Sequence, residues 1–242
     1  MSGWESQPTI GGFMTSRAER REITQRAILD ASSRLLASGG QEALTVRGLA
    51  RELNLVPSAL YRYVTSREEL LNILFHHAYS DMADSVEAAH DAVPADDLRG
   101  RWRAFAYALR AWSVEHPHEW VLINGTPPRD YQVPASETMT SGIRLHRLLV
   151  KLGADTEASG QMIELPPVPD TIDLTQMHEF LESTGEKISV ETVVTGVAAW
   201  HMLSGILFTE RFGFWGNDII EPNAYYDLIV AASERLIFGP EN

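Results

Sequence analysis

The segment Thr45–Tyr63, TVRGLARELNLVPSALYRY, constrains the fold most, because it predicts two short helices joined by a tight turn. Thr45 is a favourable N-cap for the first helix, and apolar residues recur after it at helical spacing. The residues Asn54-Leu55-Val56 interrupt that pattern. Pro57 then suits the first turn of a second helix, where its missing N–H is not needed.

The second helix of this pair carries side chains that suit a nucleic-acid surface. It holds small residues, an arginine and two tyrosines: Ser58, Ala59, Tyr61, Arg62 and Tyr63. Side chains of these types contact phosphates and the edges of bases. Paired short helices are also common in helical proteins that bind no DNA, so the flanking sequence has to decide between the two interpretations.

The flanks extend the pair into a three-helix module. Upstream, residues 17–37 show a long helical pattern that ends at Gly39-Gly40, a favourable C-terminal stop. Downstream, Ser66 and Glu69 have the spacing of a capping box, in which each side chain accepts a hydrogen bond from the other residue's backbone N–H. A long helical pattern with an apolar face follows.

The run AILDASSRLLASGGQEALTVRGLARELNLVPSALYRYVTSREELLNILF resembles the DNA-binding domain of the TetR family of bacterial repressors. Two later segments, HPHEWVLINGTPPRDYQVPA and AAWHMLSGILFTERFGFW, resemble the body of an actinobacterial-type subgroup with a WHG-like C-terminal domain. The resemblance implies an all-α fold with a three-helix head and a larger helical body. We therefore expect a disordered leader over residues 1–16, a helix-turn-helix DNA-binding domain over 17–65, and a ligand-binding and dimerisation domain over 66–242.

The net charge of −13 is unevenly divided along the chain. Residues 1–63 hold eight arginines and six acidic residues, a balance of +2, whereas residues 64–242 hold twelve basic and twenty-seven acidic residues, a balance of −15. Charge asymmetry between parts matters more for DNA binding than total charge. An acidic body would repel DNA and leave only the head to approach it. The simpler explanation is that the acidic residues only keep the surface of the body solvated, and both explanations can hold.

Composition and motifs argue against several other classes of protein. The chain has no cysteine, which excludes disulfides and thiol catalysis and suits a cytoplasmic location. No uninterrupted apolar run approaches the ~20 residues of a membrane helix, and the first sixteen residues lack a signal peptide's features. No GxSxG, HExxH, Walker or GxGxxG motif is present, so we expect neither an enzyme nor a cofactor. His116 and His118 are more typical of a surface than of a metal site.

The candidate DNA-binding residues lie at the starts of the two short helices and just beyond them. They are Thr45, Arg47, Pro57, Ser58, Ala59, Tyr61, Arg62, Tyr63 and Arg67. Thr45 and Arg47 sit at a helix N-terminus, which favours phosphate, although capping and surface charge are the simpler alternatives. Arg62 can read guanine bidentately or neutralise a phosphate.

The family resemblance adds roles to three of these positions. It implies that Tyr61 and Tyr63 contact the DNA backbone and that Arg67 clamps a phosphate. Leu60 and Val64, which stand on either side of residues 61–63, are expected to face the core of the head.

The rest of the chain predicts a helical body. Helical patterns run from Asp96-Asp97 to about Glu115, from Pro117 to a stop at Gly125, and over residues 136–152. A proline-rich loop is expected over residues 126–134 and a proline-rich break over 165–169. A short helix follows over 174–181, and two long apolar helices over 190–212 and 222–238 finish the chain.

Aromatic, methionine and a few polar side chains on these helices are the candidate lining of a ligand pocket. They are Trp102, Phe105, Leu109, Trp120, Asn124, Tyr131, Met139, Ile143, His146, Met177 and Trp200. For each one the alternative is an ordinary core position. Asn124 and His146 are the expected polar anchors for an apolar, uncharged or weakly polar ligand.

In the resembled family the last two helices pack against those of a second subunit. Six residues on these two helices are candidates for either the core or the dimer interface, and the sequence does not divide them between the two. They are Trp200, Leu203, Leu207, Tyr226, Ile229 and Leu236. The expected function is a homodimeric repressor that a small apolar effector releases from a pseudo-palindromic DNA operator. The alternative is a helical ligand-binding protein or enzyme whose head no longer binds DNA.

Overall fold

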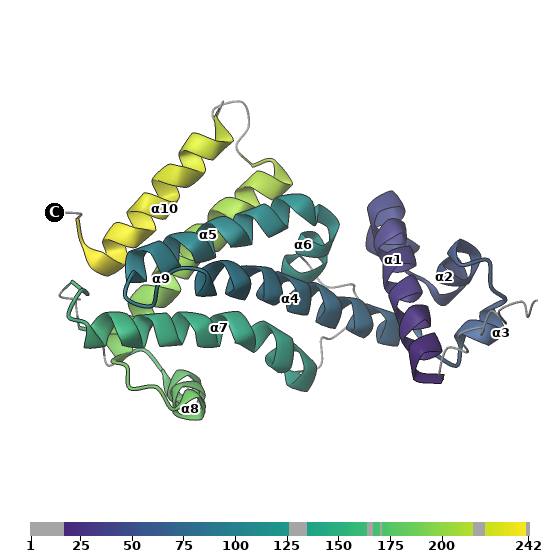
Figure 1. Ribbon diagram of the computed structural model, residues 1–242, viewed down its shortest axis with the longest axis horizontal. Coiled ribbons are helices and arrows are strands. Elements are labelled where there is room, and N and C mark those ends of the chain that lie inside the picture. The colour runs from purple at the N-terminus through teal and green to yellow at the C-terminus, as the bar shows by residue number, and fades with distance from the viewer. Residues whose placement is uncertain (1–16, 126–134, 164–166, 170, 215–220, 241–242) are drawn as a thin grey trace, which may run out of the picture. The chain divides into compact units, whose positions relative to one another are not determined.

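The computed structural model of the chain describes residues 17–125, 135–163, 167–169, 171–214 and 221–240 (Figure 1). Every regular element within these ranges is a helix, so the expected all-α fold is confirmed. The chain divides into two compact units, residues 1–70 and 71–242. The expected leader over residues 1–16 and the loop over 126–134 lie outside the described residues.

The first unit contains α1 (Arg17–Ala43), α2 (Val46–Glu52) and α3 (Pro57–Leu60). Gly40 interrupts α1 with φ 61°, in the left-handed region that favours glycine, so the helix stops where the Gly-Gly pair predicted. The core of this unit is formed by apolar residues from all three helices and the turn after α3, including Ile28, Leu35, Leu49, Leu60 and Val64. The predicted core positions Leu60 and Val64 are fully buried.

The turn between α2 and α3 is fixed by Asn54, which has φ 53°. Asparagine is one of the few non-glycine residues that adopt this conformation readily. The N–H of Leu55 donates to the Ala50 carbonyl at 2.8 Å, and the N–H of Asn54 donates to the Arg51 carbonyl at 3.2 Å. These two bonds form a Schellman motif, which ends α2 sharply and allows α3 to begin at Pro57, three residues after Asn54.

The capping arrangement before α4 (Arg67–Asp91) differs in one contact from the predicted capping box. Ser66 Oγ accepts the N–H of Glu69 at 3.0 Å, as expected. The Glu69 carboxylate, however, accepts the backbone N–H of Thr65 at 2.6 Å, not that of Ser66, and also the Thr65 hydroxyl. The carboxylate therefore reaches one residue further back and binds two donors on Thr65.

In the part of the chain that the structure describes, the second unit contains the rest of α4 and six further helices. They are α5 (Leu98–Glu115), α6 (Pro117–Asn124), α7 (Ala135–Ala158), α8 (Thr175–Thr184), α9 (Val190–Phe212) and α10 (Pro222–Phe238). In Figure 1, α5, α9 and α10 lie side by side, and pairwise contacts join all three. α7 packs on α5 and α9, and a cluster of Val150, Leu181 and Val193 connects α7, α8 and α9.

Local signals predicted most of these boundaries. Asp97 caps α5 by accepting the N–H of Gly100 at 2.8 Å, and Ser189 caps α9 by accepting the N–H of Thr192 at 3.2 Å. α7 continues six residues beyond its predicted end, and α8 three residues beyond its predicted end. α9 and α10 match the predicted ranges.

α9 is a long and strongly apolar helix. By length and composition alone it is long and apolar enough to cross a membrane; its most apolar window has a mean hydropathy of 1.4, and 33% of that window is buried. The sequence criterion passed over it because polar residues interrupt the apolar run. In the second unit α9 packs against α5, α7 and α10, which is the position of a core helix.

Candidate nucleic-acid interface and ligand cavity

The start of α3 presents its polar side chains to solvent. Pro57, Ser58 and Arg62 are exposed, and Tyr61 is 48% exposed, which is unusual for an aromatic side chain. Ala59 is half-buried. Because Leu60 anchors the other side in the core, the exposed residues form one outward surface.

α3, the second helix of the predicted pair, is shorter than the sequence predicted. The N–H groups of Tyr63 and Val64 both donate to the Leu60 carbonyl, at 2.8 and 3.0 Å, so the chain closes a tight turn after Leu60. Tyr61, Arg62 and Tyr63 therefore lie in this turn and not on the helix. The Arg62 guanidinium carbon lies 4.8 Å from the centroid of the half-buried Tyr63 ring, a cation–π contact.

Thr45 and Arg47 occupy the N-terminus of α2. The Thr45 hydroxyl accepts the N–H of Gly48 at 2.9 Å, so the side chain acts as the predicted N-cap. Arg47, two residues later, is exposed. A positive side chain therefore lies close to the helix N-terminus, and the phosphate contact expected there stays a prediction.

Arg67 has a structural contact that the sequence did not reveal. Its Nε donates to the Leu44 carbonyl at 3.0 Å, and one terminal nitrogen donates to the Gln41 carbonyl at 2.9 Å. The guanidinium thus joins the first turn of α4 to the end of α1 and to the residue that follows it. The predicted phosphate contact would have to use its remaining nitrogen, and it stays a prediction.

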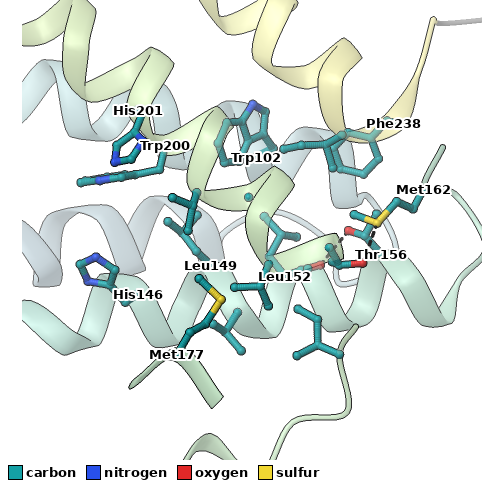
Figure 2. Close-up of a pocket in the computed structure, with 18 of the residues that line it drawn as sticks. Trp102, His146, Leu149, Leu152, Thr156, Met162, Met177, Trp200, His201 and Phe238 are labelled. Atoms are coloured by element: carbon teal, nitrogen blue, oxygen red, sulfur yellow. Dashed lines mark hydrogen bonds between the residues drawn. The ribbon is translucent and has the colours of Figure 1, made fainter. Parts of the chain in front are cut away.

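The second unit encloses a cavity of about 310 Å³, within the range of small-molecule sites (Figure 2). Its lining comes from α5, α7, α8, α9 and α10 and from the segments before α8 and α9, and it is mostly apolar. Four predicted pocket residues line it: Trp102, His146, Met177 and Trp200. The cavity therefore shares four residues with the predicted pocket, and the rest of its lining consists of side chains that were not predicted.

The other predicted pocket residues do not line this cavity or cannot be placed. Phe105, Leu109 and Trp120 are fully buried in the core instead. Asn124 is exposed, and its amide donates to the Trp120 carbonyl at 3.2 Å, so it is not a polar anchor here. Ile143 is half-buried outside the lining. Tyr131 and the side chain of Met139 lie outside the described residues.

Several lining residues were missed by the sequence analysis. They include Leu149, Thr156, Phe180, Ile188, Thr192 and Phe238. Leu149 follows His146 by one helical turn on α7, so helical spacing from a correctly chosen residue would have found it. Phe238 is the last residue of α10, and nothing in its local sequence distinguishes it from an ordinary core position.

Two histidines lie at one end of the cavity. His146 of α7 and His201 of α9 are both exposed, whereas most of the lining is buried or half-buried. The ring centroids of His146 and Trp200 are 5.9 Å apart, and Figure 2 shows the labelled His146, Trp200 and His201 together at this end. Within the described ranges, no group of three or more potential ligands could hold a metal ion.

These features define a helix-turn-helix DNA-binding regulator with a separate helical body. Residues 28–74 match the sequence profile described as bacterial regulatory proteins, tetR family. Residues 102–233 match the profile described as the Tetracyclin repressor-like C-terminal domain. The chain belongs to the TetR family of transcriptional regulators.

Individual relatives agree with this assignment. The chain is 32% identical over 216 residues to the HTH-type transcriptional regulator Rv1816 of Mycobacterium tuberculosis, covering 87% of this chain and 91% of the relative. It is 31% identical over 120 residues to the HTH-type transcriptional repressor DrrR1 of Streptomyces coeruleorubidus, covering 48% of this chain and 41% of the relative. The crystal structure of the regulatory protein SCO4313 superposes with a TM-score of 0.68 at 25% identity, over 90% of this chain and 98% of that one.

Proposed function

We propose that the protein is a cytoplasmic repressor that leaves its operator when a small, largely apolar effector enters the cavity of the second unit. The observation that carries this proposal is the combination, in one chain, of an exposed recognition surface around Arg62 and an apolar cavity of about 310 Å³. The name of the DrrR1 relative, a repressor, supports the direction of regulation.

The repressor would bind as a homodimer through α9 and α10. Phe208 and Phe212 are exposed, and their spacing of four residues places them along one face of α9. Phe214 is 70% exposed and Leu228 of α10 is 60% exposed. A second copy on this apolar surface would give the two-fold symmetry that a pair of operator half-sites requires.

The effector signal would travel from the cavity to the head along α7 and α4. His146 lines the cavity, and Arg144, two residues earlier on α7, donates to the Glu87 carboxylate of α4 at 3.0 Å. α4 is continuous from Arg67, in the first unit, to Asp91 in the second. A ligand that moves α7 would therefore shift α4 and change the separation of the two heads.

The test is DNA binding by the purified protein to its own promoter region, followed by fluorescence anisotropy. We expect specific binding that weakens with rising salt, and a loss of about tenfold or more in Arg62→Ala, because a good bidentate base contact contributes about 1–3 kcal/mol. The matched control is Arg26→Ala, since Arg26 is exposed on α1 and pairs only locally, with Glu22. Absence of binding at low salt would instead favour a helical ligand-binding protein with an inactive head.

A further inference from the structure

The two ends of the cavity differ in chemistry. Figure 2 places the labelled His146, Trp200 and His201 at one end and Thr156, Met162 and Phe238 at the other. The first end is the open one, because both histidines are exposed and Val197, one helical turn before His201, is 38% exposed. At the second end Thr156 and Phe238 are buried.

The polar groups of the buried part are already occupied by the protein. The Thr156 hydroxyl donates to the Leu152 carbonyl at 2.7 Å, and the Thr192 hydroxyl donates to the Glu157 carboxylate at 2.7 Å. The Trp102 indole N–H donates to Ser233 Oγ at 3.1 Å. A ligand group in this part meets mostly carbon and sulfur surface and no free side-chain donor among these three groups, so an apolar group is favoured there and a hydrogen-bond acceptor such as a carboxylate would lose its hydration without compensation.

The open end carries the only ionisable side chains among the described residues that line the cavity. These are the imidazoles of His146 and His201, which come from two different helices, α7 and α9. A neutral imidazole donates one hydrogen bond, and a protonated imidazole donates two and carries a positive charge. No carboxylate is found among the described residues that line the cavity. An anionic acceptor at this end therefore has partners that a cationic group would lack.

We propose that the cavity binds an amphipathic carboxylate, with its apolar body in the buried part and its single carboxylate head between His146 and His201. The inference deepens the proposed function, on which its regulatory meaning rests, because it gives the effector a chemical class. It also replaces the expectation of an uncharged effector with one that has an apolar body and an acidic head.

Calorimetric titration of the full-length protein, without DNA, tests the head group with three probes of equal chain length: octanoate, octanol and octylammonium. We expect octanoate to bind most tightly and octylammonium least tightly. In the series hexanoate, octanoate and decanoate, affinity should rise about fourfold for each added methylene, because each one buries further apolar surface. Octanoate that binds no more tightly than octanol, or not at all, would overturn the proposal.

Replacing each histidine by phenylalanine keeps a flat ring and removes its nitrogens. We expect His146→Phe and His201→Phe each to weaken octanoate binding about five- to tenfold, the effect of one charge-assisted hydrogen bond at a partly exposed site. Octanol affinity should change less than twofold. The matched control is His178→Phe, since His178 is exposed on α8 and outside the lining. An equal loss of octanoate binding in the control would also overturn the assignment of the head group.

The two proposals fail in different measurements. If octanoate binds as expected but does not release operator DNA in the anisotropy assay, the cavity chemistry stands and the repressor mechanism is wrong. If operator DNA is bound but octanoate shows no preference over octanol, the regulator stands and the carboxylate assignment is wrong.

Discussion

Arg144 of α7 and Glu87 of α4 form a bidentate ion pair, in which Arg144 Nε donates to one carboxylate oxygen at 3.0 Å and a terminal nitrogen donates to the other. The same guanidinium also donates to Asp84, one turn earlier on α4, at 2.6 Å. Hydrogen bonds to Glu87 and then Asp84 raise the pKa of Arg144 above its ordinary value. The guanidinium therefore stays charged throughout the accessible pH range and holds α7 to α4.

Arg144→Met should loosen α4 without unfolding the protein. Because the side chains of Arg144 and Glu87 are about one-third exposed, we expect the free energy of unfolding to fall by only about 1 kcal/mol. Amide hydrogen exchange should accelerate in residues 81–91 of α4. The control Lys151→Met removes an exposed pair within α7, with Asp155, and should change neither quantity appreciably. Unchanged exchange in α4 would show that the pair does not couple the helices.

The helix boundaries could be predicted because their signals are local. Asp97, Ser189 and Pro222 each specify a helix start within four residues of sequence. The cavity could be predicted only in part. Trp102 and Phe105 lie three residues apart on α5 with ring centroids 6.0 Å apart, yet Trp102 lines the cavity and Phe105 does not. Helical periodicity identifies the buried face of a helix, but it does not show which part of that face meets empty space.

Long-range polar contacts are the second feature of the structure that could not be predicted from the sequence. The carbonyl partners of Arg67 lie 23 and 26 residues away, and no local pattern links them. The sequence identified Arg67 as a basic residue near DNA, whereas the structure shows that it also joins the chain segments of the head. Its substitution therefore has two expected effects and not one.

Arg62→Ala and Arg67→Ala should differ in sequence dependence. Arg62 is exposed with no carbonyl partner in the described structure, so its loss should change the preference between the operator and scrambled DNA. Arg67→Ala should weaken both DNAs about equally and also lower the thermal stability of the head, because two carbonyls lose their donor. Gel-shift titrations on both DNAs and a melting curve measure this. Equal losses of specificity in the two variants would contradict the distinction.

Glu234 is a buried carboxylate on which two arginines converge. Its side chain is 4% exposed, and it accepts hydrogen bonds from Arg99 at 2.9 Å and from Arg103 at 2.8 Å. We expect Glu234→Gln to lower the free energy of unfolding by about 2–3 kcal/mol, since it removes the buried negative charge that faces both arginines. Urea denaturation measures the loss, and Glu182→Gln, at an exposed site on α8, is the control. If Glu234→Gln lowered the free energy of unfolding by no more than Glu182→Gln does, water would be compensating the two arginines for the lost negative charge.

Glu157 should make part of the stability depend on pH. Its carboxylate accepts the N–H of Ser189 at 2.9 Å and the hydroxyl of Thr192 at 2.7 Å at the start of α9. The hydrogen bond from the Ser189 backbone is the main reason that the pKa of Glu157 lies below its ordinary value of 4.5. A lowered carboxyl pKa stabilises the fold above the unfolded-state pKa, and this stabilisation disappears as pH falls through the folded-state pKa.

The stability difference between the wild type and Glu157→Gln should therefore be largest near neutral pH, at about 1 kcal/mol, the usual contribution of a helix cap. It should shrink once the pH falls below about 4.5. Urea denaturation at a series of pH values measures it. A difference that stays constant down to acidic pH would show that the charge of Glu157 is not what stabilises the start of α9.

Phe208 tests the proposed dimer surface. It is 39% exposed, and its ring centroid lies 4.4 Å from that of Phe212 and 6.0 Å from that of Phe214, so the three rings form one apolar cluster. A charge in the middle of this cluster would have to lose its hydration in a dimer, whereas in a monomer it stays in water. We therefore expect Phe208→Glu to remain folded and to shift the protein from dimer to monomer in sedimentation velocity.

The control for this variant is Val114→Glu, which introduces the same charge at a 51% exposed apolar residue of α5, outside α9 and α10. It should leave the protein dimeric. Operator affinity should fall sharply in Phe208→Glu, because a monomer engages only one half-site and loses the gain from binding both at once. A Phe208→Glu protein that sediments as the wild type does would place the dimer surface elsewhere on the chain.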